Sequence, residues 1–205
     1  SAENIFDNYL LAFGGPDGVL IPYDRFRRTT LEDSILKDIF LKLLEKYKVV
    51  IISNQRYYDD PRTKELGLQS RLINYIPPHL RKNLTLYTSA GTFKIGFDEE
   101  GREIPDESYN KNTYIEPEYV EIILSVLNEV KDNWWREYKN NPSLWRNKYP
   151  IFNFREPEII LHKDKEDHIH AITLLYLPSK RLEAHNLEKG EKDVRETLYK
   201  EIKQK

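Results

Sequence analysis

Cysteine is absent from the chain, and this absence excludes disulfide bonds and any metal or redox site built on thiolates. Long apolar runs are also missing, since no stretch approaches the ~20 residues of a membrane-spanning helix. A strong excess of basic residues is missing too. The net charge of −2 gives no electrostatic footprint for nucleic acid. The first residues, Ser1-Ala2-Glu3-Asn4, are polar and acidic and show no secretory signal, so we expect a cytoplasmic protein.

The residues that are present describe a folded, water-exposed protein. Hydrophobic residues make up 39% of the chain and charged residues 32%. A length of 205 residues suits one large domain or two small ones. The composition therefore favours a globular protein with neither a membrane nor a nucleic acid as its partner. It leaves the oligomeric state open.

The first fifty residues carry the pattern of a β-loop-α-β unit. Residues 9–13 predict a strand, and the apolar run 49–52 predicts a second, parallel strand buried on both faces. Between them, apolar side chains recur at helical spacing from Leu31 to Tyr47, with Thr30 as the expected N-cap. Such units build doubly wound sheets, so we expect an α/β fold with a Rossmann-like parallel sheet.

The rest of the chain predicts a different organisation. A short helix near residues 66–73, ended by Pro77-Pro78, precedes a third strand at 84–88. Beyond it we expect alternating strands at 92–97 and 102–104, a helix at 117–138, antiparallel strands at 158–162 and 168–177, and a last helix at 191–204. We therefore expect two domains: an α/β core over 1–88 and an α+β module over 89–205.

Polar residues follow the first two parallel strands. Asp17 and Gly18 lie in the turn after the first strand, and Ser53 and Asn54 come directly after the second. Ligands bind beyond the carboxyl ends of strands in open parallel sheets. A carboxylate beside a hydroxyl and free backbone amides is an arrangement that handles phosphate. An ordinary Pro-Asp-Gly turn is the alternative interpretation of Asp17.

These motifs resemble those of the haloacid-dehalogenase-like (HAD) superfamily of phosphatases and phosphomutases. That family opens with an apolar strand, Asp, any residue, Asp, Gly, Thr or Val, and Leu. Residues 16–20, Pro-Asp-Gly-Val-Leu, match all but the first Asp. The family's second motif, an apolar strand ending in Ser or Thr, is matched by residues 50–53, Val-Ile-Ile-Ser. Residues 92–205 are similar to the α+β cap of its phosphomannomutase and trehalose-phosphate phosphatase branch.

The resemblance implies a role for each site residue. Asp17 would be the general acid/base, and its backbone carbonyl would help to hold Mg²⁺. Ser53 would bind the phosphoryl group, and Gly18 would allow the close turn. Asn54 and Arg56 would contact the substrate, a sugar phosphate or another small phosphomonoester.

Position 15 departs from the family pattern. Gly15 stands where the family has its nucleophilic, metal-binding Asp, and the later Lys and acidic pair of the family are absent. Covalent phosphoryl transfer needs that carboxylate. The sequence therefore predicts an impaired phosphatase. The alternative is a non-catalytic module, a pseudo-phosphatase, that binds a phosphorylated ligand or a protein.

A second group of candidate residues lies between the last two predicted strands. His168 and His170 share one face of a strand, with Asp164, Glu166 and Asp167 nearby. Metal ligands have such spacing. A charged, solvated turn has the same pattern, and we favour that interpretation.

Overall fold

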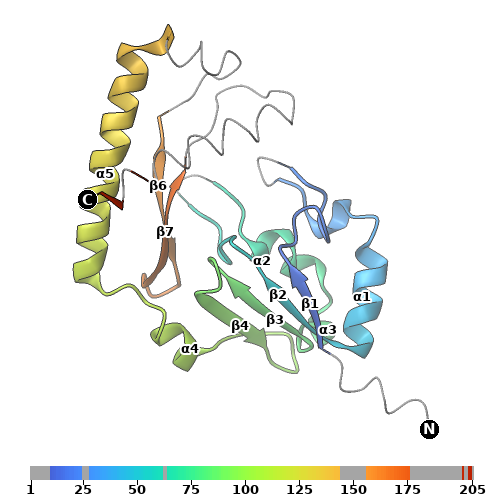
Figure 1. The fold of residues 1–205 in the computed structure, drawn as a ribbon. Helices are drawn as coiled ribbons and strands as arrows, with labels where there is room; N and C mark the ends of the chain where they lie inside the picture. The colour runs from blue at the N-terminus through green and yellow to red at the C-terminus, as the bar shows by residue number, and fades with distance from the viewer. Residues whose placement is uncertain are drawn as a thin grey trace. The chain divides into compact units, whose positions relative to one another are not determined.

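The computed structural model describes residues 10–24, 28–61, 64–143, 156–175, 200, 203 and 204 (Figure 1). Contacts within the chain divide it into two compact units. The first contains residues 1–114 and 162–171, and the second contains 115–161 and 172–205. The boundary that we expect at residue 88 falls inside the first unit. The division into a core and a cap therefore stays a prediction.

A five-stranded sheet, in the order β1-β2-β3-β4-β5, forms the centre of the first unit. The strands β1 (Leu10–Gly14), β2 (Lys48–Ile52) and β3 (Leu84–Thr88) are parallel to one another. The strands β4 (Phe93–Phe97) and β5 (Glu103–Pro105) extend the sheet in antiparallel pairs. The sheet and its helices give the α/β, Rossmann-like fold that the sequence predicts.

The segment between β1 and β2 contains two helical pieces instead of one helix. Thr30 makes the expected capping box with Asp33, but it caps only a single 3-10 turn, η2 (Leu31–Asp33). Ser34 then adopts an extended backbone, and the helix α1 (Lys37–Lys46) begins three residues later. The expected continuous helix is wrong because the capping box is completed within one turn, and Ile35 beyond it is 95% exposed.

Short helices connect β2 to β3, and another follows β5. These are α2 (Leu68–Arg71), the 3-10 turn η3 (Ile73–Tyr75), α3 (Pro78–Arg81) and, after β5, α4 (Glu107–Lys111). The prolines Pro77 and Pro78 do not simply end a helix as expected. Pro78 is the first residue of α3, a position where the missing proline N–H costs nothing.

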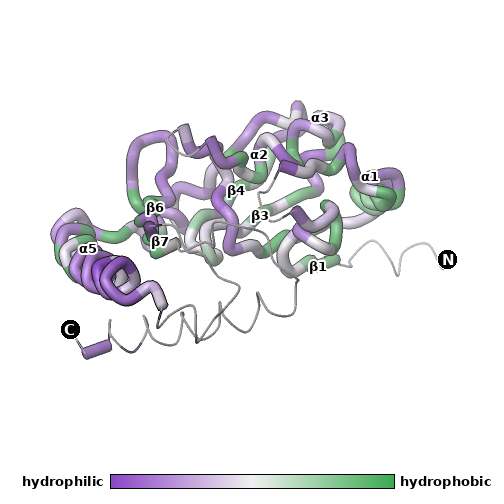
Figure 2. The backbone as a smooth tube through the Cα atoms, turned by 90° about the horizontal axis from the view of Figure 1, so that it is seen from above, coloured by the Kyte–Doolittle hydropathy of each residue, from purple (hydrophilic) through white to green (hydrophobic). Residues whose placement is uncertain are grey.

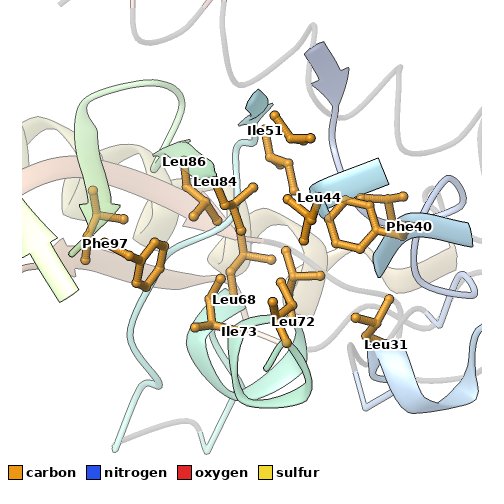
Figure 3. Packing of buried hydrophobic residues seen from close by; sticks show 14 of the residues in the cluster. Leu31, Phe40, Leu44, Ile51, Leu68, Leu72, Ile73, Leu84, Leu86 and Phe97 are labelled. Atoms are coloured by element: carbon orange, nitrogen blue, oxygen red, sulfur yellow. The ribbon is translucent and has the colours of Figure 1, made fainter. Parts of the chain in front are cut away.

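One face of the sheet carries the hydrophobic core. Side chains from β2 and β3 pack against those of η2, α1, α2 and η3 (Figure 3). Alternation along the strands places these side chains on a single face. The core residues labelled in Figure 3 are Leu31, Phe40, Leu44, Ile51, Leu68, Leu72, Ile73, Leu84, Leu86 and Phe97.

In the part of the chain that the structure describes, the opposite face is open over β1 and β2. Leu10 in β1 is 61% exposed, and Ile52 in β2 is 52% exposed. Ala12, two residues after Leu10 and on the same face of β1, is exposed as well. The expectation that 49–52 is buried on both faces is therefore wrong. The described helices α1, α2 and α3 all lie on the other side of the sheet (Figure 2). Over β3 and β4, Tyr109 of α4 covers the open face by packing on Tyr87.

The second unit contains the long helix α5 (Pro117–Asn140) and parts of the strands β6 (Glu158–Lys163) and β7 (Ile169–Leu175). A turn of five residues joins β6 to β7, and so short a connection requires an antiparallel pair. α5 buries Val120, Leu127, Val130, Trp134 and Tyr138. Both hydrophobic and hydrophilic residues appear along it (Figure 2).

The two helices expected in the second half of the chain have different outcomes. The helix expected at 117–138 is present as α5, but its apolar residues Tyr119 and Ile122 are 55% and 60% exposed and lie outside the buried stripe. The last helix, expected over 191–204, lies outside the described residues apart from isolated positions. In the part of the chain that the structure describes, no helix is both long and apolar enough to cross a membrane.

Candidate functional site

The segments that follow the three parallel strands are joined by backbone hydrogen bonds. The N–H of Gly15 donates to the carbonyl of Ile52 at 2.7 Å, and that of Ser53 donates to Tyr87 at 2.8 Å. One step further, the N–H of Ser89 donates to the carbonyl of Gln55 at 2.7 Å. The carboxyl ends of β1, β2 and β3 therefore form one continuous edge, as the topology requires.

The turn after β1 depends on two glycines in the left-handed region. Gly15 has φ of +64° and Gly18 has φ of +76°, values that other residues adopt at a cost. The carbonyl of Pro16 accepts N–H donors from Leu20 at 2.8 Å and Ile21 at 2.9 Å. A Cβ atom added at Gly15 or Gly18 would meet no other atom within 4 Å. The backbone of this turn is therefore open to an approaching ligand.

The carboxylate of Asp17 is held by an arginine. Nη2 of Arg71 donates to Oδ1 of Asp17 at 2.6 Å, and Nη1 lies 3.3 Å from Oδ2. The side-chain amide of Gln55 donates to Oδ2 at 2.5 Å. The Arg71 side chain has no exposed surface, whereas that of Asp17 is 17% exposed. Both carboxylate oxygens are therefore engaged by protein donors, in the fork geometry that makes Arg–carboxylate pairs strong.

The remaining donors of Arg71 join further segments to the same point. Nε donates to the backbone carbonyl of Thr29 at 2.8 Å, and Nη1 donates to the side-chain oxygen of Gln55 at 2.8 Å. Nη2 also lies 3.4 Å from Oγ1 of Thr29. A guanidinium has five N–H donors, and all five point at acceptors here. Arg71 therefore ties α2 to the turn after β1, to the segment after β2 and to the loop before η2.

The expected site residues Ser53, Asn54 and Arg56 have three different surroundings. Ser53 is 4% exposed, and its Oγ accepts the N–H of Gln55 at 3.0 Å, which leaves the hydroxyl hydrogen to donate. Asn54 is exposed. Arg56 is paired at 2.9 Å with both Asp60 and Glu65. Gln55 connects Asp17 to Ser53 by hydrogen bonds to both. Arg56 instead forms ion pairs within the loop that follows β2.

Sequence reasoning missed Arg71 and Gln55. Arginine is a surface residue in most proteins, and a single sequence gives little warning of a buried one. One signal was present. Arg71 lies three residues after Leu68 and next to Leu72, both fully buried, so it falls on the apolar face of the predicted helix. A charge on that face needs a partner of opposite sign, and Asp17 is that partner.

The turn after β3 contains three successive residues in the left-handed region: Ser89, Ala90 and Gly91, with φ of +51°, +62° and +84°. Backbone hydrogen bonds support the strained pair, since Ala90 donates to the carbonyl of Ser53 at 3.1 Å. The Ser89 hydroxyl lies 3.2 Å from Nδ1 of His162. This turn therefore buttresses the segment that carries Ser53, and His162 contacts it from β6.

The histidine and acidic residues between β6 and β7 form a structural cluster around Asp164. Its Oδ1 accepts the N–H groups of Glu166 and His168, each at 2.9 Å. Its Oδ2 lies 3.0 Å from Nδ1 of His168 and 3.2 Å from Nε2 of His170. Burial acts to raise the pKa of Asp164, but the hydrogen bonds from His170 and His168 outweigh it and lower that pKa.

The residues at the strand-end edge do not assemble the donor set of a magnesium site. Mg²⁺ requires oxygen ligands, usually one or two carboxylates, at about 2.0–2.1 Å in octahedral geometry. Gly15 offers no side chain, and both carboxylate oxygens of Asp17 accept hydrogen bonds. The backbone carbonyl of Asp17, the ligand that the resemblance implies, therefore has no free carboxylate beside it. Within the described residues, the one group of three possible ligand side chains is Asp164, Glu166 and His168, which excludes Asp17.

No known family model matches the chain, and no curated protein matches it. Solved structures do resemble it. An IMP-bound mutant of Plasmodium falciparum IMP-nucleotidase has a TM-score of 0.51 and 16% identity over 93% of this chain and 45% of that one. An IMP-bound, N-terminally truncated form of the same protein has a TM-score of 0.50 and 18% identity over 94% and 46%.

These likenesses concern the fold. The chain spans less than half the length of the structures it resembles. Identity of 16–18% supports no statement about shared ligands or activity. They support the α/β, Rossmann-like arrangement of the sheet that positions the strand-end edge.

Proposed function

We propose that this chain is a HAD-like, phosphatase-type protein that binds a small phosphomonoester at its strand-end edge without turning it over. The edge consists of the turn Gly15–Gly18 and the segment Ser53–Gln55. The observation that carries the proposal is the connection of Asp17 to Ser53 through Gln55, at the ends of adjacent parallel strands.

Two side-chain donors at this edge suit a phosphoryl oxygen. The Ser53 hydroxyl has its hydrogen free to donate, and the exposed Asn54 amide lies next to it in the chain. The glycine turn leaves room for an anion to approach the backbone closely. These donors give a binding site for a phosphoryl group without a covalent step.

The arrangement of Asp17 supports binding over turnover. A general acid has to carry a proton on an oxygen that faces the substrate. Both Asp17 oxygens instead accept N–H donors from Arg71 and Gln55. Position 15, where the family's nucleophile would stand, is a glycine with a left-handed backbone. The chain therefore lacks a carboxylate at the nucleophile position, and the Asp17 carboxylate is paired with the Arg71 guanidinium.

IMP, the ligand named with both solved structures, is a phosphomonoester and gives a first probe. Isothermal titration calorimetry should detect binding of IMP to the unaltered chain, and no binding of inosine, which lacks the phosphate. We expect Asn54→Ala to weaken binding about tenfold, or ~1.4 kcal/mol, because one hydrogen bond to a charged phosphoryl oxygen is lost. Glucose 6-phosphate, titrated in parallel, distinguishes nucleotide from sugar-phosphate preference.

Asn74→Ala is the matched control. Asn74 is exposed like Asn54, but it lies in η3 instead of at a strand end, and its removal should leave the affinity unchanged. Equal affinity for IMP and inosine would contradict the proposal, and so would equal losses in both variants. Phosphate release that requires Mg²⁺ and disappears in Asp17→Asn would instead favour an active phosphatase.

A further inference from the structure

The strand-end edge carries a negative charge of its own, although its proposed ligand is an anion. Within the segments Gly15–Gly18 and Ser53–Gln55, Asp17 is the one charged side chain. Gln55 connects its carboxylate to Ser53, whose hydroxyl would donate to a phosphoryl oxygen. An unbalanced carboxylate so close to a phosphoryl group would repel it, because like charges interact strongly where little water separates them. Binding of an anion here therefore requires a positive charge nearby.

Arg71 supplies that positive charge. Its Nη2 lies 2.6 Å from Oδ1 of Asp17 and its Nη1 lies 3.3 Å from Oδ2, and the side chain has no exposed surface. Arg56, the residue that follows the edge in the chain, does not supply it. Arg56 forms ion pairs at 2.9 Å with both Asp60 and Glu65, so its charge is already balanced. Arg71 is therefore the cation that balances Asp17.

We infer that Arg71 enables the strand-end edge to accept an anion by cancelling the charge of Asp17, so that affinity for a phosphomonoester follows the net charge of this pair. Arg71 is a positioning residue that acts through Asp17. It touches no ligand, because its N–H groups all point at acceptors on Asp17, Gln55 and Thr29. The inference rests on the proposed function in taking this edge as the phosphomonoester site, and it adds an electrostatic requirement to the hydrogen-bond donors there.

Three substitutions change the charge of the pair in different ways. Asp17→Asn leaves the pair positive, and Arg71→Met leaves it negative. Arg71→Lys keeps the pair neutral but weakens the contact, since lysine lacks the guanidinium fork. Titration of each variant with inorganic phosphate, followed by the NMR signals of the amides of residues 15–18 and 53–55, measures the affinities.

The affinities should follow the charge and not the strength of the ion pair. Relative to the unaltered chain, we expect phosphate binding at least about threefold tighter in Asp17→Asn and at least about tenfold weaker in Arg71→Met. Arg71→Lys should stay within about threefold, because the charge is retained. All three substitutions weaken the contact, so a purely structural role of Arg71 predicts lower affinity in all of them. Weaker phosphate binding in Asp17→Asn would overturn the inference.

The double variant Asp17→Asn, Arg71→Met covers the case in which Arg71→Met does not fold. It leaves neither partner of the buried pair as an unpaired charge, so it avoids the penalty of the single substitution. The pair is neutral again, and we expect phosphate affinity within about threefold of that of the unaltered chain. A larger loss would overturn the inference.

Asp98→Asn is the matched control. Asp98 is likewise paired with an arginine, Arg102, at 2.7 Å. It lies in the turn after β4, and because β4 is antiparallel to β3, this turn is at the opposite end of the sheet from the strand-end edge. The same change of charge there should leave phosphate affinity unchanged. An increase equal to that of Asp17→Asn would show a general effect of net charge and would overturn the inference.

The titrations separate this inference from the proposed function. Binding of IMP and inosine to the unaltered chain decides the proposed function, whereas the order of phosphate affinities among the variants decides the role of Arg71. Asp17→Asn leaves the guanidinium without its carboxylate, so it should bind phosphate even if the unaltered chain binds no IMP. Absence of phosphate binding by Asp17→Asn would overturn the inference, whatever the result with IMP.

Discussion

At the scale of single residues, the pair Asp17–Arg71 decides what the strand-end edge can do. The sequence motif identified Asp17 as a candidate acid/base. The structure places it in the turn after β1, at the edge where the parallel strands end. Its neighbours determine its behaviour. Two donors from Arg71 and one from Gln55 convert a candidate acid/base into the partner of a buried cation.

Removal of Arg71 should destabilise the fold strongly. Arg71→Met leaves Gln55 as the one described donor to the Asp17 carboxylate, and it removes the Arg71 bonds to the Thr29 carbonyl and the Gln55 side-chain oxygen. We expect a loss of about 3–5 kcal/mol in the free energy of unfolding, the range found when one partner of a buried ion pair is removed. Urea denaturation followed by circular dichroism measures this loss.

Arg102→Met is the matched control for this prediction. Arg102 also forms an ion pair, with Asp98 at 2.7 Å, but its side chain is 75% exposed. Water and salt screen exposed pairs, so the free energy of unfolding should change little. Equal effects of the two substitutions would contradict the assignment of Arg71 as a buried organising residue.

At the scale of elements, strand periodicity was the most reliable guide. The sequence predicted β1, β2, β3 and β4 to within one residue at the described ends, because apolar runs bounded by polar turns leave few alternatives. The region of residues 55–83 was harder to interpret. Its helices α2 and α3 are four residues each, too short for a helical repeat to stand out. Arg71, which completes the candidate site, lies in this region.

The short helix α4 gives a prediction of pH dependence. Hydrogen bonds from Lys94, then from the Tyr109 N–H and Ser108, lower the pKa of its N-cap residue Asp106 to about 2. A carboxyl with a lowered pKa stabilises the fold above its unfolded pKa of about 3.9, and this stability is lost as the pH falls through the folded value. Asp106 should therefore contribute to acid sensitivity between about pH 4 and pH 2.

Asp106→Asn isolates this contribution, because asparagine is an equally good N-cap but carries no charge. We expect the thermal midpoint of the variant to fall less steeply between pH 4 and pH 2 than that of the unaltered chain. Asp38→Asn, at an exposed position in the first turn of α1, is the control and should retain the original slope. A parallel pH profile for Asp106→Asn would show that the Lys94 and Tyr109 contacts do not stabilise the ionised form.

At the scale of the whole molecule, the sequence predicted the α/β class but not how completely its sheet is covered. Buried parallel strands normally have helices on both faces. In the described residues, helices cover the Val49 and Ile51 side of β2, while Ile52 on the other side stays exposed. Apolar composition alone cannot distinguish a strand covered on both faces from one covered on a single face.

The candidate site shows the same division between what sequence can and cannot supply. Topology alone places Asp17 and Ser53 on one edge, because adjacent parallel strands end together. The contact between Asp17 and Arg71 joins residues 54 positions apart, and no local pattern encodes it. The likeness to IMP-nucleotidase supports the fold. What the candidate site can do chemically depends on the contacts of Asp17, Arg71 and Gln55.

Binding of a phosphomonoester without turnover is the property that the proposed function assigns to the strand-end edge. A single ³¹P NMR experiment on the unaltered chain with IMP and Mg²⁺ tests it most directly. We expect the IMP phosphorus signal to broaden or shift in the presence of the protein, and we expect no inorganic phosphate to accumulate. Steady growth of the inorganic phosphate signal, or an IMP signal that the protein leaves unchanged, would contradict it.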